Sequence, residues 1–249
     1  MAIAMLILNG TSKIFTVLFS CYYLFFCPVL SAKPLNLNDL WYEIHAKGKK
    51  TGYLNLRVTS DTESSPVTRS FEISSYLEVR YLVFFKFTFD SEEKVVIDPV
   101  KGLMEYSRVL VVNGKNKVLT TGKLEGDEFT FELTTDEINR KKSYNREEYD
   151  YCSLDNPYNL LEKQEEKFKI LDLERHEITE VSYTWVRNQN TVIDGDTICC
   201  KVIEFKSDIK RGQRWITPDR YGIVIFEEGK LESGHYSLRL STREKAIQF

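Results

Sequence analysis

The clearest regularity along the chain is an alternation of apolar and polar residues with a period of two. From Phe71 to Phe89 the odd positions are almost all apolar, and the even positions are mainly polar as far as Arg80. Because successive side chains of a β-strand point to opposite faces, this stretch predicts strand with one nearly continuous apolar face. It is long for one strand, so we expect either a strongly curved strand or two strands that meet at a bend.

Shorter alternating segments, separated by turn residues, occupy most of the chain after residue 40. Asn113-Gly114 is the strongest short hairpin signal, and the glycines at positions 48, 52, 126, 195 and 229 mark further turns. We count about ten or eleven strands in antiparallel succession, and strands do not alternate with helices as in a parallel sheet. The sequence therefore predicts a mostly β fold: a curved antiparallel sheet, or an open and unclosed barrel.

The segment 136–174 differs from the rest because charged residues crowd together around a tyrosine cluster. Asn156-Pro157 is typical of a helix cap followed by proline at the first helical position. We predict one short helix from Pro157 to about Lys163, and loop over the remainder of the segment.

The N-terminus predicts an export signal. Residues 14–30 contain no charge, Lys13 precedes them, and the small residues Ser31-Ala32 follow. This is the order of a signal peptide. We assign residues 1–32 to the signal and residues 33–249 to a single β-rich domain, which places the protein in the periplasm or outside the cell. The competing interpretation is an uncleaved anchor.

Composition narrows the function classes. Hydrophobic residues make up 42% of the chain and charged residues 29%, an ordinary globular balance. The net charge of −3, with both signs scattered, supplies no basic surface for nucleic acid. We therefore expect no nucleic-acid partner, and contact with a membrane that is peripheral at most.

Export also affects how the cysteines are interpreted. The exported chain keeps Cys152, Cys199 and Cys200, and an oxidising compartment permits Cys152 to form a disulfide with one of the vicinal pair. Cysteine is also a common small buried apolar residue. Both interpretations stay open at this point.

The C-terminal half resembles a known family. Residues 191–202, with a turn at Asp194-Gly195, are followed by Trp215-Ile216-Thr217-Pro218, residues 219–222 and the strand 223–226. This order is similar to that of uncharacterised bacterial periplasmic domains related to the LolA-like, lipoprotein-carrier fold. Residues 41–44 and 50–53 fit the first hairpin of such domains. The resemblance implies an apolar concave face that receives acyl chains, with helical material as a lid.

The sequence carries no recognisable catalytic or metal-binding motif. None of His45, His176 and His235 lies in a hydrolase or zinc-protease context, and adjacent carboxylates such as Glu147-Glu148 point to opposite faces of a strand. Asp194-Gly195-Asp196 lacks the remaining ligands of a calcium loop. We therefore expect no enzyme, no catalytic residue, no metal and no cofactor, and we keep an exported hydrolase as the weakest alternative.

The apolar face of the long alternating stretch is the feature with functional promise. We predict that it binds a lipid or a lipidated protein through Leu77, Val79, Val83, Phe85, Phe87 and Phe89. The competing interpretation is that these residues are simply the core of the sheet. In that case the protein is a structural or interaction module of the cell envelope with a fully packed core.

Overall fold

The computed structural model describes residues 39–61, 68–81, 85–154, 160, 164–193, 195–218, 222–232 and 234–248, with the backbone alone at residues 80, 81, 85 and 116. By its internal contacts the chain divides into Met1–Pro34 and Leu35–Phe249. The first unit lies outside the described residues, and the predicted signal, residues 1–32, lies there too. Within the described part of the second unit, no helix has the length and apolar character needed to cross a bilayer.

Strands dominate the second unit. The described residues contain fifteen strands, all in one sheet with the order β8-β7-β6-β5-β4-β3-β2-β1-β15-β14-β13-β12-β11-β10-β9. Their bounds are β1 (Leu40–Ala46), β2 (Lys49–Asp61), β3 (Thr68–Tyr81), β4 (Phe85–Asp98), β5 (Gly102–Val112), β6 (Asn116–Glu125), β7 (Glu128–Thr134), β8 (Asn139–Asn145), β9 (Tyr151–Cys152), β10 (Glu165–Asp172), β11 (Glu177–Ile193), β12 (Asp196–Lys206), β13 (Lys210–Ile216), β14 (Val224–Leu231) and β15 (Gly234–Ser241).

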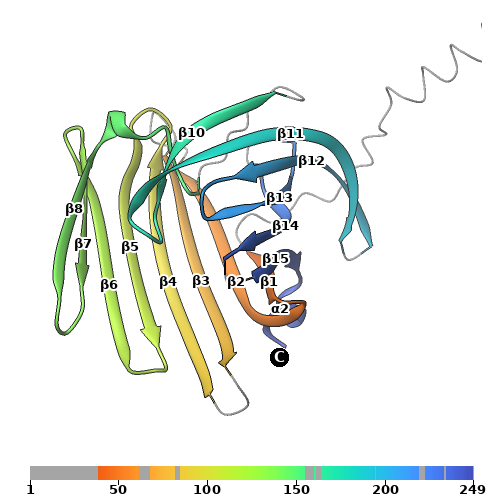
Figure 1. The fold of residues 1–249 in the computed structure, drawn as a ribbon, viewed down its shortest axis with the longest axis horizontal. Helices are drawn as coiled ribbons and strands as arrows, with labels where there is room; N and C mark the ends of the chain where they lie inside the picture. The colour runs from red at the N-terminus through yellow and green to blue at the C-terminus, as the bar shows by residue number, and fades with distance from the viewer. Residues whose placement is uncertain are drawn as a thin grey trace, which may run out of the picture. The chain divides into compact units, whose positions relative to one another are not determined.

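The sheet consists of two antiparallel runs of strands, which are joined because the first strand, β1, pairs with the last strand, β15. Strands β1 to β8 pair in sequence order, as do β10 to β15, and Figure 1 shows the first run side by side. The two runs meet where β1 pairs with β15, with Trp41 opposite Ser241. Of the described pairs, only β9 with β10 is parallel. This largely antiparallel succession confirms the predicted fold class.

Two hairpins show why the chain reverses where it does. Lys47 and Gly48 both have positive φ, at 51° and 75°, and so have Asn113 and Gly114, at 53° and 68°. A β-turn of this kind requires positive φ at both central residues, which glycine and asparagine adopt most easily. The Asn113 side chain also accepts a hydrogen bond from the Thr88 amide at 2.9 Å, which ties this turn to β4.

The long alternating stretch is a hairpin rather than one curved strand. It is divided between β3 and β4, which pair from Arg69 opposite Ile97 to Tyr81 opposite Phe85. The expectation of two strands is therefore correct, but they fold back on each other instead of meeting at a bend. Alternation along the sequence cannot distinguish a hairpin from a bend or from one curved strand. If the chain reverses direction in a turn that keeps the period of two, the pattern of apolar and polar residues stays the same.

The segment 136–174 is more ordered than predicted. It contains β8, β9, β10 and a one-turn 3-10 helix, η1 (Arg146–Glu148), so the prediction of loop over this segment is wrong. The strand β8 consists mainly of exposed polar residues and therefore lacks an alternating pattern. The predicted helix, residues 157–163, lies outside the described residues apart from Leu160. A short helix, α2 (Arg243–Ile247), follows β15 and packs against β1 and β2.

The sheet curls so that its two ends approach each other without pairing. One cluster of buried side chains combines Val95, Tyr106 and Phe129 from β4, β5 and β7 with Cys152 and Leu171 from β9 and β10. A second cluster surrounds Tyr42, Cys200 and Ile225, and a third surrounds Tyr183 and Ile216. In the described sheet the end strands β8 and β9 are not paired with each other. The sheet is therefore curved and unclosed, as predicted.

Candidate ligand-binding site

The side of the sheet that carries the first buried cluster, here called the inner face, changes character along β3 and β4. Phe71 and Ile73 on β3 are buried. Further along the same face come Ser75, Leu77 and Val79, because every second residue shares a side of the strand. Val79 is 45% exposed. The inner face thus begins in the core and ends in an open surface.

Four apolar side chains form that open surface, which we call the apolar stripe: Leu77, Val79, Phe87 and Phe89. In the ladder Leu77 stands opposite Phe89 and Val79 opposite Phe87, so all four lie on the inner face in two neighbouring pairs. Phe87 is 41% exposed, and Leu77 and Phe89 are half-buried. Val79 and Phe87 are therefore not part of a packed core. The side chains of the other two predicted ligand-binding residues, Val83 and Phe85, lie outside the described part.

A cavity opens at the buried end of the same face. Its volume is about 180 Å³. Most of its walls are apolar side chains of β1 to β3 and β14 to β15, together with Leu154 after β9 and the polar pair Arg214 and Glu227. The cavity is lined by Tyr42, Leu54, Leu56, Val58, Phe71, Ile73, Ser153, Leu154, Arg214, Gly222, Ile223, Val224, Glu227 and Leu238.

An uncharged path along β3 connects the cavity to the apolar stripe. Phe71 and Ile73 belong to the cavity wall, and Leu77 and Val79 to the stripe, with only Ser75 between them. On the neighbouring strand Gly52 stands opposite Leu77. A Cβ at this glycine would lie 3.1 Å from the Leu77 Cδ2 atom and 2.1 Å from the Tyr76 carbonyl oxygen, so the position has no room for a side chain.

Two charged residues, Arg214 and Glu227, belong to the cavity wall and interact with neighbouring polar side chains. The Arg214 Nε donates to Glu227 Oε2 at 2.6 Å, the Tyr236 hydroxyl donates to Glu227 Oε1 at 2.7 Å, and Lys210 Nζ lies 2.8 Å from the same oxygen. Burial alone would raise the pKa of Glu227, but the two cations and these hydrogen bonds hold it at about 2. The carboxylate is therefore ionised and fully engaged, which gives it a structural role.

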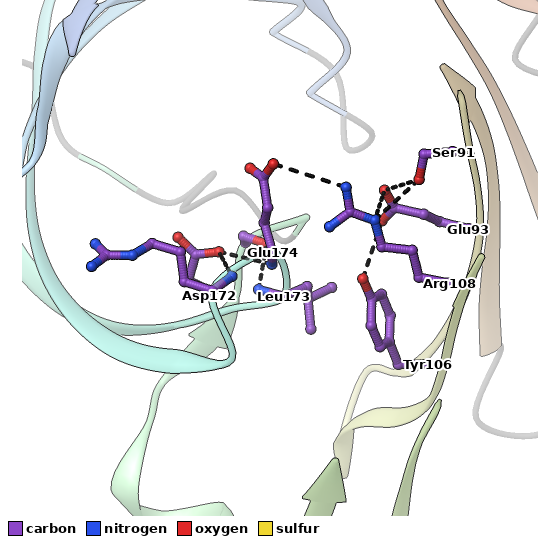
Figure 2. Close-up of polar contacts among 9 residues, drawn as sticks. Ser91, Glu93, Tyr106, Arg108, Asp172, Leu173 and Glu174 are labelled. Atoms are coloured by element: carbon purple, nitrogen blue, oxygen red, sulfur yellow. Dashed lines mark hydrogen bonds and ion pairs between the residues drawn. The ribbon is translucent and has the colours of Figure 1, made fainter. Parts of the chain in front are cut away.

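A second polar group, shown in Figure 2, lies on the inner face of β4 and β5 beside the apolar stripe. The Arg108 Nε donates to Ser91 Oγ at 3.1 Å and lies 3.4 Å from Glu93 Oε1. Glu93 also accepts hydrogen bonds from Ser91 Oγ at 3.2 Å and from the Tyr106 hydroxyl at 3.4 Å. Burial raises the pKa of Glu93, and Arg108 offsets part of that effect. These contacts hold the guanidinium by its Nε edge.

The turn between β10 and β11 reaches this polar group from the other end of the sheet. Glu174 Oε1 lies 3.9 Å from the Arg108 NH2 atom, although its own side chain is 80% exposed. Next in the turn, the His176 ring packs against Phe131 with ring centroids 4.8 Å apart, and its carbonyl accepts a hydrogen bond from the Tyr144 hydroxyl at 2.7 Å. Burial lowers the pKa of His176, and Arg108 lowers it further. The turn thus covers the inner face of the opposite run.

The remaining histidines lie in a polar hollow of about 510 Å³ that both His45 and His235 line. The His45 Nε2 lies 3.1 Å from Glu43 Oε2, and the Ser241 hydroxyl donates to the other oxygen of Glu43 at 3.3 Å. This serine therefore bonds to the carboxylate and not to the imidazole that would have to activate it. Across the described residues no group of three metal-binding side chains gathers.

The cysteines lie in different surroundings. Cys152 is buried in the first cluster and Cys200 in the second, while Cys199 is half-buried. Burial raises the pKa of the Cys200 thiol to about 11, and this thiol lies 3.7 Å from the Ile198 carbonyl oxygen. A disulfide involving Cys152 stays a prediction.

The charged residues of the inner face were not predicted from the sequence. Arg108 occupies a position whose same-face neighbours in β5 are Tyr106 and Leu110, and Glu227 follows Ile225 on the same face of β14. A charge that interrupts an apolar face of a predicted strand is the signal that marks such residues, because an isolated charge is costly to bury. The pairing of Arg108 with Glu174 had no sequence signal.

Comparisons with known proteins identify the fold. A scan against models of protein families and a search of curated proteins gave no match. Among solved structures the chain is similar to a beta-barrel-like protein of domain of unknown function DUF1849 from Brucella abortus, with a TM-score of 0.60. The fold is barrel-like. The two chains are 11% identical, and the match covers 82% of this chain and 95% of that one. At this identity the likeness concerns the fold alone.

Proposed function

We propose that the protein is a non-catalytic binding protein of the cell envelope that holds an apolar chain, from a lipid or a lipidated protein, on the inner face of its curved sheet. The observation that carries this proposal is the uncharged path along β3 from the cavity to the apolar stripe. Ile73 at the cavity and Val79 in the stripe are six residues apart, which corresponds to about 20 Å of extended strand. That length suits an extended alkyl chain rather than a compact ligand.

The exposure of the stripe supports this function over a packed structural module. Large apolar side chains left open to water in a soluble protein are typical of binding surfaces when they lie together. Val79 and Phe87 are such a pair, and they stand opposite each other on neighbouring strands. A chain laid on them would remove apolar surface from water, and the gain is roughly 25 cal/mol per Å².

Export and the LolA-like relationship belong to the same proposal. The signal-like residues 1–32 and the resemblance to lipoprotein carriers both suit a protein that handles lipid outside the cytoplasm. The barrel-like neighbour is compatible with this view at the level of the fold. The tyrosine cluster offers less support for an interaction module, because Tyr149 is buried and Tyr144 packs against the first cluster.

Native mass spectrometry of the protein purified gently from the envelope fraction tests the proposal. We expect a bound species of lipid mass that is lost in Val79→Asp and Phe87→Asp, both of which change exposed side chains and so should fold. The matched control is Val192→Asp, since Val192 is 58% exposed but lies on β11, outside the stripe. An apo mass with no uptake of added fatty acid or phospholipid would contradict the proposal and favour the structural module.

A further inference from the structure

The polar group beside the apolar stripe has the features of a head-group site. Glu93 stands opposite Arg108, and the next inner-face pair along β4 and β5 is Ser91 opposite Leu110, followed by Phe89 opposite Val112. The inner face thus changes from charged to apolar over two successive pairs. An amphiphile with its chain on the stripe would bring its head close to Arg108.

Arg108 is held so that one side of its guanidinium stays available to a second anion. Its Nε edge is fixed by Ser91 and Glu93, which leaves the NH2 side directed at the β10–β11 turn, as Figure 2 shows. The side chain is only 15% exposed. An arginine in these surroundings binds an anion more strongly than it would in water, because the local dielectric is lower.

The anion that now faces the NH2 side is a weak partner. Glu174 approaches Arg108 only to 3.9 Å, and its side chain is 80% exposed. Exposed pairs of this kind contribute little, since water and salt screen them. Glu174 can therefore return to solvent at small cost, and a ligand anion that replaces it leaves the net charge around Arg108 unchanged.

We propose that the ligand is an anionic amphiphile whose head group displaces Glu174 from Arg108 while its alkyl chain lies on the apolar stripe. This inference rests on the proposed function and adds the chemistry of the head group. Glu93 and Ser91 act as positioning residues that orient the guanidinium. A carboxylate and a phosphate head share the required chemistry, and the experiment below separates them.

Calorimetric titration of the purified protein with dodecanoate, dodecyl phosphate and dodecan-1-ol tests this assignment. The expected result is that at least one of the two anions binds about tenfold more tightly than the alcohol, as a charge-assisted hydrogen bond provides. Which anion binds more tightly identifies the head group. Equal binding of the alcohol and both anions would overturn the head-group assignment but not the proposed function, whereas absence of binding by all three would overturn both.

Replacement of Glu174 tests directly whether this residue competes with the ligand for Arg108. Glu174→Gln removes the competing carboxylate from an exposed position, so the preferred anion should bind several-fold more tightly while the alcohol is unaffected. Glu177→Gln is the matched control, since it removes the same charge from the first residue of β11, where Glu177 pairs with Arg175. Unchanged or weaker anion binding in Glu174→Gln would overturn the proposal that the head group displaces Glu174 from Arg108. The same gain in affinity in Glu177→Gln would overturn it as well.

Substitution of Arg108 completes the test. Arg108→Gln should reduce the affinity for the anion to that for the alcohol. Arg108→Lys keeps the positive charge beside Glu93, so that this carboxylate is not left without a cation, and it should retain a preference for the anion. A preference for the anion that survives in a folded Arg108→Gln variant would overturn the role of this residue.

Discussion

Replacement of Glu227 by glutamine is expected to be the most destabilising single change in the polar part of the cavity wall. The Glu227 side chain is 6% exposed and receives Arg214, Lys210 and Tyr236 within 2.8 Å, and Arg214 is itself only 16% exposed. Glutamine leaves two cations beside a neutral amide, and removing one partner of a buried ion pair costs about 3–5 kcal/mol. That is a large share of a typical unfolding free energy of about 5–15 kcal/mol.

Urea unfolding monitored by circular dichroism measures this loss. With an m-value of about 2–3 kcal/mol/M, the midpoint should fall by roughly 1–2.5 M. Glu228→Gln is the matched control, because the neighbouring Glu228 is exposed and its replacement should change stability by less than about 0.5 kcal/mol. A loss below about 1 kcal/mol in Glu227→Gln would refute the argument that this carboxylate neutralises Arg214 and Lys210 in the fold.

The same carboxylate predicts a specific pH dependence. Its pKa is about 2 in the folded protein against an ordinary value of 4.5, so it stabilises the fold above pH 4.5 and this contribution is lost as the pH falls toward 2. A depression of this size corresponds to roughly 3 kcal/mol. Unfolding free energies measured between pH 6 and pH 2 should therefore fall more steeply in the wild type than in Glu227→Gln. Parallel curves would contradict the assignment of the low pKa.

Three further experiments probe other parts of the fold. The pKa of His176 is lowered by burial, so the wild type should lose stability as the pH falls below 6.5, and urea unfolding of His176→Asn should show a flatter profile. A Cβ at Gly229 would lie 2.7 Å from the Tyr236 hydroxyl, so Gly229→Ala should cost about 1–3 kcal/mol in thermal unfolding, at least as much as Tyr236→Phe. Cys200 is buried with a thiol pKa of about 11, so iodoacetamide at pH 8 should label it only after unfolding, and rapid labelling of the folded protein would contradict its burial.

Much of the local structure could be predicted from the sequence. The period of two placed Leu77, Val79, Phe87 and Phe89 on one face, and the ladder confirms that they share it. The hairpin signal at Asn113-Gly114 is correct because its backbone requires positive φ at both residues. The mostly β fold could be predicted from the same patterns, since alternation and turn residues are local features of the sequence.

The prediction of loop was wrong for β8, β9 and β10, and two of these strands carry no pattern of their own. The strand β8 is polar along nearly its whole length, and β9 has two residues, so neither shows alternation. Their places in the sheet depend on pairing with β7 and β10, which supply the hydrogen bonds that their side chains do not indicate. Propensity is a weak guide when the partner strand decides the conformation.

The sequence by itself determined which side chains share a face, where the chain turns and that the protein is built from strands, because these depend on neighbours along the chain. Only the tertiary structure decided what covers each face. It left Val79 and Phe87 open, buried Glu227 among two cations and brought Glu174 to Arg108. The physical reason is that burial depends on how the sheet curls, and the curl is set by contacts between residues far apart in sequence, such as Trp41 with Ser241.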